Sequence, residues 1–217
     1  KREICICLDS FSKLMEVQPF CNFELSDLFD CSDKIAQYHN PEIKKFHGLF
    51  QGKRCFIIAT GPSLKIEDLN VLKEKGELCI SMNSIFHAFE QTDWRPDYYV
   101  AADCREINAD KDLIDRWLVK GKFISDTSKE FWEAPHEENV YRYHQHYAYY
   151  FQKLPKFSED FSSKSYAGCT VTYTCLQLAA YMGFKEIYLL GVDFSYGGKK
   201  KNMVYTHFHK EENLEAT

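Results

Sequence analysis

The sequence predicts an α/β fold with a doubly wound, mostly parallel sheet that carries helices on both faces. Short apolar runs alternate with helical patterns from about residue 53 onward. Several of these runs are apolar at every position, which is typical of parallel strands buried on both faces. Glycine and small polar residues follow directly after them. Alternating strands and helices of this kind form a Rossmann-like sheet.

The composition is that of a globular domain. The 217 residues carry a net charge of −5 and are 45% hydrophobic, which suits one domain of ordinary core size and excludes a disordered or fibrous chain. We expect an N-terminal extension over residues 1–50 and a nucleotide-binding or catalytic domain over residues 51–217. Within that domain, residues 126–168 are expected to form an insertion or lid.

Charge and cysteine usage limit the partners and the cellular compartment that we expect. The mild acidity disfavours nucleic acid as a partner, and no apolar run approaches the roughly 18 residues of a membrane span. The nine cysteines are scattered without a C-x-x-C pair, so we interpret them as buried thiols in a reducing compartment. We expect a cytoplasmic protein, and the sequence leaves open peripheral contact with the inner face of a membrane and a homo-oligomer. The missing initial Met and the polar C-terminal run suggest a piece of a longer protein.

The first half of the chain contains three predicted strands. A helix-like stretch around residues 35–50 is interrupted by Asn40-Pro41, and the run 54–59 is the first strand of the sheet. Apolar residues at helical spacing from Ile66 predict a helix that Gly76 ends. Strands over 78–82 and 98–102 follow, with a short helix over 85–89 between them.

The second half repeats the rhythm after an interruption. The spacing predicts a helix over 109–118 and a strand over 122–125, and then residues 126–168 lose any clean period and are rich in Tyr and His. A helix over 170–182 with Gly183 at its end and a strand over 186–192 complete the pattern.

Ligands of an open parallel sheet bind at the carboxyl ends of its strands, so residues just after strands are the site candidates. The turn Thr60-Gly61-Pro62-Ser63 matches neither the Walker nor the G-x-G-x-x-G pattern. Gly61 would still let backbone approach a ligand, and amides near Ser63 could face an anion. The alternative is a plain turn in which Ser63 caps the following helix.

The other candidates also have structural alternatives. Asn83 could bind a ligand or form an Asx-type cap, and Asp103 could bind a ligand or pair with Arg105. Gly168 and Thr170 open a helix whose amides a ligand could reach, although such a turn is also ordinary. His207 and His209 suit a general base or belong to a polar tail. They lack a third ligand at metal-binding spacing, so a metal site is the weaker interpretation.

Four blocks of this chain resemble a known family. They are RCFIIATGPSL at residues 54–64, SMN at 81–83, RPDYYV at 95–100 with Asp103, and GCTVTYTCLQLAAYMGFKEIYLLGVDFSY at 168–196. They look like the bacterial domain named for the archaeal 6-hydroxymethylpterin diphosphokinase MptE. The pattern is similar to the family 42 sialyltransferases of Campylobacter and to the core of the motility-associated-factor flagellin glycosyltransferases.

The resemblance to the sialyltransferases implies an inverting transfer from CMP-sialic acid that needs no metal or other cofactor. Gly61, Pro62 and Ser63 would hold the nucleotide. Asn83 would meet its phosphate region, and residues 168–170 would contact ribose or phosphate. Gly191 and Asp193 would lie near the base, and His207 or His209 would remove the acceptor proton. Two departures, Thr60 and Asp103 where those enzymes have Asn, favour Mg2+ or a different donor.

Three functional hypotheses follow. The leading one is a glycosyltransferase that uses CMP-sialic acid or a related nonulosonate to build a cell-surface glycan such as lipopolysaccharide or capsule, with a nucleotide-sugar donor and a glycan acceptor as its partners. The second is ATP- and Mg2+-dependent transfer of diphosphate to a hydroxymethylpterin. The third is a non-catalytic nucleotide-fold module that docks through residues 1–50.

Overall fold

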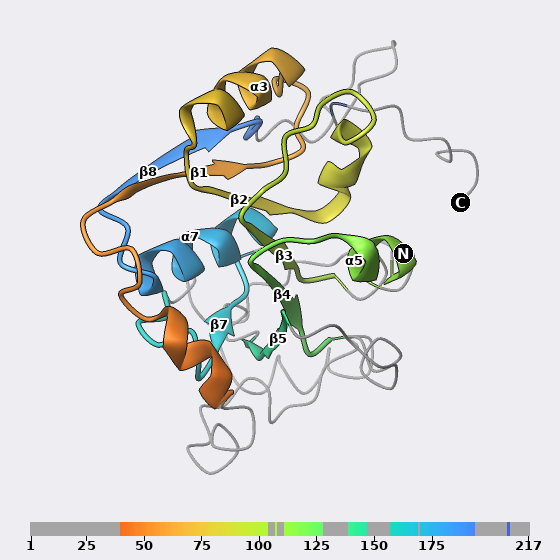
Figure 1. Ribbon diagram of the computed structural model, residues 1–217. Helices are drawn as coiled ribbons and strands as arrows, with labels where there is room; N and C mark the ends of the chain where they lie inside the picture. Colours follow the sequence, from red (N-terminus) through yellow and green to blue (C-terminus); the bar gives the residue numbers. More distant parts are fainter. Residues whose placement is uncertain are drawn as a thin grey trace, which may run out of the picture.

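The computed structural model describes residues 40–103, 107, 111–127, 139–146, 157–168, 170–193 and 208. Within them a six-stranded sheet has the order β5-β4-β3-β2-β1-β8, and every neighbouring pair is parallel (Figure 1). The main strands are β1 (Arg54–Ile58), β2 (Cys79–Met82), β3 (Tyr98–Ala101), β4 (Gly121–Ser125), β5 (Val140–Tyr143) and β8 (Glu186–Leu190). The predicted α/β class with a parallel sheet is confirmed.

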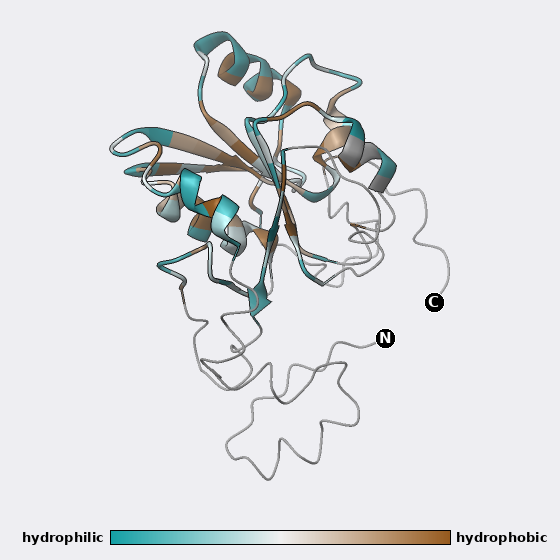
Figure 2. Ribbon diagram, turned by 60° about the horizontal axis from the view of Figure 1, so that its bottom comes forward, coloured by the Kyte–Doolittle hydropathy of each residue, from teal (hydrophilic) through white to brown (hydrophobic). Residues whose placement is uncertain are grey.

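Helices cover both faces of this sheet. The 3-10 helix η3 (Pro41–Phe46) and α7 (Val171–Tyr181) lie on one face, and α3 (Ile66–Lys75), the 3-10 helix η4 (Asn83–Ala88) and α5 (Lys111–Arg116) lie on the other. Strand side chains alternate between the two cores: Ile57 and Val100 pack with α7, whereas Ile58 and Tyr99 pack with α3. In Figure 2, hydrophobic colouring is concentrated in the middle of the sheet.

Local signals explain where the main helices begin and end. Gly76 adopts a left-handed conformation with φ 62° after α3, and its amide donates to carbonyls in the last turn of that helix. Thr170 is the N-cap of α7, because its hydroxyl accepts from the amide of Thr172. Residues 40–50 pack into the same core as the domain that follows, since Ile43 and Phe46 are almost fully buried there.

Part of the segment predicted as an insertion belongs to the sheet. Residues 140–143 form β5, and Tyr141 and Tyr143 are buried in the core beneath η3. A small pair, β6 (Gln145–His146) and β7 (Ser165–Tyr166), follows it. These residues of the segment 126–168 therefore take part in strand pairing. Residues 128–138 and 147–156 lie outside the described part, and their role as a lid stays a prediction.

The chain order creates a switch point between β1 and β8. From β1 the strands β2 to β5 follow on one side, whereas β8 lies on the other side of β1. The connecting helices α3 and α7 lie on opposite faces. Such a switch point opens the crevice in which doubly wound sheets bind ligands.

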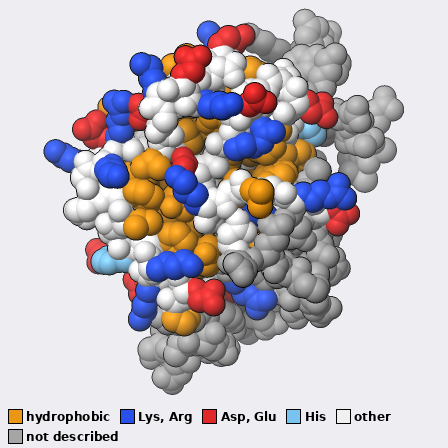
Figure 3. All heavy atoms as spheres, in the orientation of Figure 1, with side chains coloured by type: hydrophobic (Ala, Val, Ile, Leu, Met, Phe, Trp, Pro, Cys, Tyr) orange, Lys and Arg blue, Asp and Glu red, His pale blue; other side chains and the backbone are white. Residues whose placement is uncertain are grey.

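Strand β8 is more exposed than its apolar sequence suggests. Tyr188 and Leu189 are each more than 40% exposed, and β8 is an edge strand among the described residues. On the face shown in Figure 3, hydrophobic side chains lie between charged side chains of both signs.

No helix in the described part of the chain has the length and apolar character needed to cross a bilayer.

Candidate functional site at the carboxyl edge of the sheet

The ends of β1 and β8 meet through a very close backbone contact. The amide of Gly61 donates to the carbonyl of Gly191 over 2.9 Å, and that of Ala59 donates to Leu190 over 2.9 Å. A Cβ at Gly61 would lie 2.2 Å from Oδ2 of Asp193, and one at Gly191 would lie 2.4 Å from the Ala59 carbonyl oxygen. Both positions therefore require glycine, and Gly191 also has a φ of 67°.

Asp193 closes the turn between β1 and α3. Its Oδ2 accepts hydrogen bonds from both the amide and the hydroxyl of Ser63, each over 3.0 Å. The sequence alternative in which Ser63 caps α3 is wrong, because the N-cap of that helix is Lys65. The amide expected to face a ligand anion already faces a carboxylate, so this turn suits hydroxyl groups better than a phosphate. Pro62 is exposed beside it.

Asn83 is strained and partly unsatisfied at the end of β2. Its φ of 46° lies in the left-handed region, and the side-chain atom Oδ1 is buried and accepts no hydrogen bond within the described residues. The hydroxyl of Tyr99 donates a hydrogen bond to the carbonyl of Asn83 over 3.0 Å. The alternative of an Asx-type cap is wrong, since Met82 is the N-cap of η4. Backbone strain with an unpaired buried acceptor is typical of functional positions.

The start of α7 lies at the same edge. The hydroxyl of Thr172 contacts Sδ of Met82, the last residue of β2, over 3.5 Å. Packing alone explains the glycine at position 168, because a Cβ there would lie 2.4 Å from the ring of Tyr173. The edge thus brings together the ends of β1, β2 and β8 with the N-terminus of α7.

The structure describes Asp103 but not the two C-terminal histidine candidates. Asp103 is half-buried two residues after β3, and its carbonyl accepts from the amide of Ile107 over 3.0 Å. His207 and His209 lie outside the described residues. Phe208 between them is described, and its amide donates to the carbonyl of Thr60 over 2.9 Å. Within the described residues, no three His, Cys, Asp or Glu side chains gather as a metal site would require.

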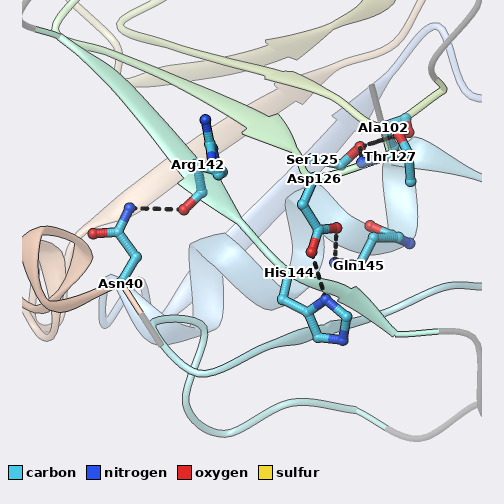
Figure 4. Close-up of polar contacts among 8 residues, drawn as sticks. All are labelled: Asn40, Ala102, Ser125, Asp126, Thr127, Arg142, His144 and Gln145. Atoms are coloured by element: carbon cyan, nitrogen blue, oxygen red, sulfur yellow. Dashed lines mark hydrogen bonds and ion pairs between the residues drawn. The ribbon is translucent and has the colours of Figure 1, made fainter. Parts of the chain in front are cut away.

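A polar pair at the ends of β4 and β5 escaped the sequence analysis. Nδ1 of His144 lies 2.6 Å from Oδ2 of Asp126, and Oδ1 of Asp126 accepts from the amide of Gln145 over 3.1 Å (Figure 4). Asp126 follows its strand directly, so the strand-end rule could have found it. His144 was hidden because β5 was not predicted.

A comparison with family models identifies the family of this chain. The model of the family described as 6-hydroxymethylpterin diphosphokinase MptE-like matches residues 31–199, more than half of the chain. The chain belongs to the MptE-like family. Its resemblance to MptE, drawn from the strand-end blocks, is confirmed.

Two further comparisons add context. Among solved structures, the chain is similar to a MAf glycosyltransferase from Magnetospirillum magneticum AMB-1, with 19% identity and a TM-score of 0.47. That likeness covers 89% of this chain and 32% of the other, so the present chain spans about a third of that enzyme. No curated protein matches the chain.

Proposed function

We propose that this MptE-like protein is a cytoplasmic glycosyltransferase that transfers sialic acid or a related nonulosonate from its CMP-linked form to a glycan acceptor. The strand-end blocks that resemble the family 42 sialyltransferases motivate the donor. The switch point between β1 and β8 carries the proposal, because its glycines bring two backbones into contact where a nucleotide would bind. No metal is required in this proposal.

The contacts suggest which part of the donor would bind at each place along the edge of the sheet. Asp193 already occupies the Ser63 amide, so the nucleoside hydroxyls rather than the phosphate would meet this turn. A carboxylate beside a ribose hydroxyl is a common arrangement in Rossmann-like folds. The phosphate would lie near Asn83 and the start of α7, where a helix N-terminus favours negative charge.

Catalysis in this proposal requires a base for the acceptor hydroxyl. A neutral imidazole would take that proton while CMP departs with the bonding electrons. His207 and His209 remain the candidates from sequence. In sequence they adjoin Phe208, whose amide donates to the carbonyl of Thr60 over 2.9 Å.

Calorimetric titration with CMP, UMP, GDP and ATP tests the donor. We expect saturable binding of CMP and an Asn83→Ala variant that binds CMP about tenfold more weakly, because one side-chain hydrogen bond to a charged group contributes roughly 1.5 kcal/mol. Asn70→Ala is the matched control, since Asn70 lies on α3, where its Oδ1 accepts from the Thr92 hydroxyl. Absence of binding to any cytidine nucleotide would contradict the proposal.

The family name supplies a second candidate, diphosphate transfer from ATP to a hydroxymethylpterin. Asp103 favours it, because a carboxylate at the edge of the sheet could bind Mg2+ beside the nucleotide phosphates. Formation of AMP from ATP and 6-hydroxymethylpterin, abolished by EDTA, would support this candidate over the glycosyltransferase.

A further inference from the structure

Asp126 and His144 form a pair in which the carboxylate orients the imidazole ring. The 2.6 Å contact between Nδ1 of His144 and Oδ2 of Asp126 places a proton between these two atoms. In the neutral imidazole this contact fixes the proton on Nδ1, so Nε2 carries the lone pair that can accept a proton. A carboxylate that orients a histidine in this way also stabilises the imidazolium that forms when Nε2 is protonated.

Neighbouring contacts hold the carboxylate in place. Asp126 lies between Ser125 and Thr127, whose hydroxyls are each 2.7 Å from the carbonyl oxygen of Ala102 at the end of β3 (Figure 4). The amide of Gln145 binds its second oxygen. Asp126 is thereby fixed from β3 and from the segment after β5, and its side chain is 21% exposed beside a His144 side chain that is 11% exposed.

Other charged and titratable groups surround the pair. Arg142 of β5 interacts electrostatically with Asp126, and burial lowers the pKa of Arg142. The ring of His146 lies 5.8 Å from that of His144, edge to face. Buried oxygen atoms without a hydrogen-bond partner among the described residues follow on β6 and β7, at Gln145 and its register partner Ser165. Unused hydrogen-bonding capacity therefore lies on the strand pair that adjoins His144, whose carbonyl accepts from the amide of Ser165 over 2.8 Å.

The place of the pair in the sheet suits the acceptor side of a transfer. Asp126 and His144 follow β4 and β5, and β4 is three strands from β1. At about 4.8 Å between neighbouring strands, the end of β4 is about 14 Å and the end of β5 about 19 Å from β1 along the edge. A sugar nucleotide whose nucleoside lies at β1 and β8 can extend its sugar along this edge toward β3 and β4.

We propose that His144 is the general base of the transfer reaction and that Asp126 is its positioning residue. Nε2 takes the proton of the acceptor hydroxyl as that oxygen bonds to the anomeric carbon. The bond from this carbon to the phosphate oxygen breaks, and CMP leaves with the electron pair. His144 then returns its proton to water. This assignment rests on the proposed function and competes with His207 and His209 for the same role.

Donor hydrolysis tests the assignment, with CMP-sialic acid as the probe and water as the acceptor. We expect His144→Ala to lower kcat about 100-fold or more while the Kd for CMP is unchanged. Added imidazole should restore part of the lost rate, which a purely structural role would not allow. His47→Ala is the matched control, because His47 is exposed and its ring lies tilted against that of Tyr181 at the far end of α7.

The Asp126→Asn variant tests whether Asp126 orients the ring of His144 or only stabilises the fold. We expect it to lower kcat with little change in KM and to remove the preference for the Nδ1-protonated tautomer of His144, read from the nitrogen-15 shifts of its ring. An unchanged tautomer, or a His144→Ala variant with the wild-type kcat, would overturn the assignment.

The outcomes separate this inference from the proposed function. If the wild-type protein releases CMP and only His207→Ala or His209→Ala loses activity, the glycosyltransferase stands and His144 is not its base. If the wild-type protein neither binds CMP nor releases it from CMP-sialic acid, the proposed function fails and the assignment fails with it.

Discussion

A methyl group added at Gly191 would meet the Ala59 carbonyl oxygen at 2.4 Å, whereas one added at Gly76 would meet nothing within 4 Å. The two residues have nearly equal φ values, 67° and 62°, so they form a matched pair. Gly76→Ala should cost about 1 kcal/mol of left-handed strain. Gly191→Ala should cost roughly 1–3 kcal/mol more, because it also forces apart the ends of β1 and β8. Urea unfolding of both variants measures the difference, and equal losses would contradict the close contact.

Residue-scale chemistry at the turn was only partly predictable. Gly61, Ser63 and Asp193 were recognised as residues that follow strands, but their mutual contact was not. Ser63 and Asp193 are 130 residues apart in sequence, and no local spacing encodes a hydrogen bond of that range. The hydrogen bond from the Tyr99 hydroxyl to the carbonyl of Asn83 also joins residues that no local spacing in the sequence relates.

At the scale of elements, Gln177 joins α7 to the segments that precede it. The side chain is fully buried. Its Oε1 accepts from the amides of Ser158 and Tyr166, and its Nε2 donates to the carbonyls of Tyr166 and Tyr173. This one side chain therefore fixes residues 158–166 against the helix whose N-terminus faces the site.

Gln177→Met keeps the volume and removes these hydrogen bonds. We expect it to lower the free energy of unfolding by roughly 3 kcal/mol, because buried amides and carbonyls lose their partners. Gln91→Met, at an exposed position, should change stability by less than about 0.5 kcal/mol. Chemical denaturation compares them, and a Gln177→Met protein as stable as the control would refute the role of this side chain.

The elements themselves follow from periodicity where the period is clean. The apolar runs of β1, β2 and β3 and the capped pattern of α3 match the structure to within a few residues. Strand β5 was missed because Val140, Tyr141, Arg142 and Tyr143 mix aromatic and charged residues in a segment whose sequence has no clean period. Missing β5 also hid His144, so an error in one element removed a residue from the candidate site.

At the scale of the whole molecule, burial determines the chemistry of the described cysteines. Cys55, Cys79 and Cys175 are free and buried, and they lie in β1, β2 and α7. Burial raises the pKa of the Cys55 and Cys79 thiols to about 12 and raises that of Cys175 as well. The interpretation of these three as small core residues is confirmed.

These thiols should resist iodoacetamide at pH 8 in the native protein and react once urea unfolds it. Above about pH 9 the unfolded state loses thiol protons that the native state keeps, so stability should fall as pH rises toward 12. Peptide mass spectrometry after alkylation gives the readout. Rapid labelling of Cys55, Cys79 and Cys175 without urea would show that the core is open.

The pairing of β1 with β8 has a consequence for synthesis. During translation, Ser63 leaves the ribosome 130 residues before the carboxylate of Asp193 that completes its turn. Strands β2 to β4 can assemble on β1 in the meantime, but the nascent chain holds an unfinished crevice until β8 arrives. A ligand that requires both strands would therefore act on the finished domain and not on its growing precursor.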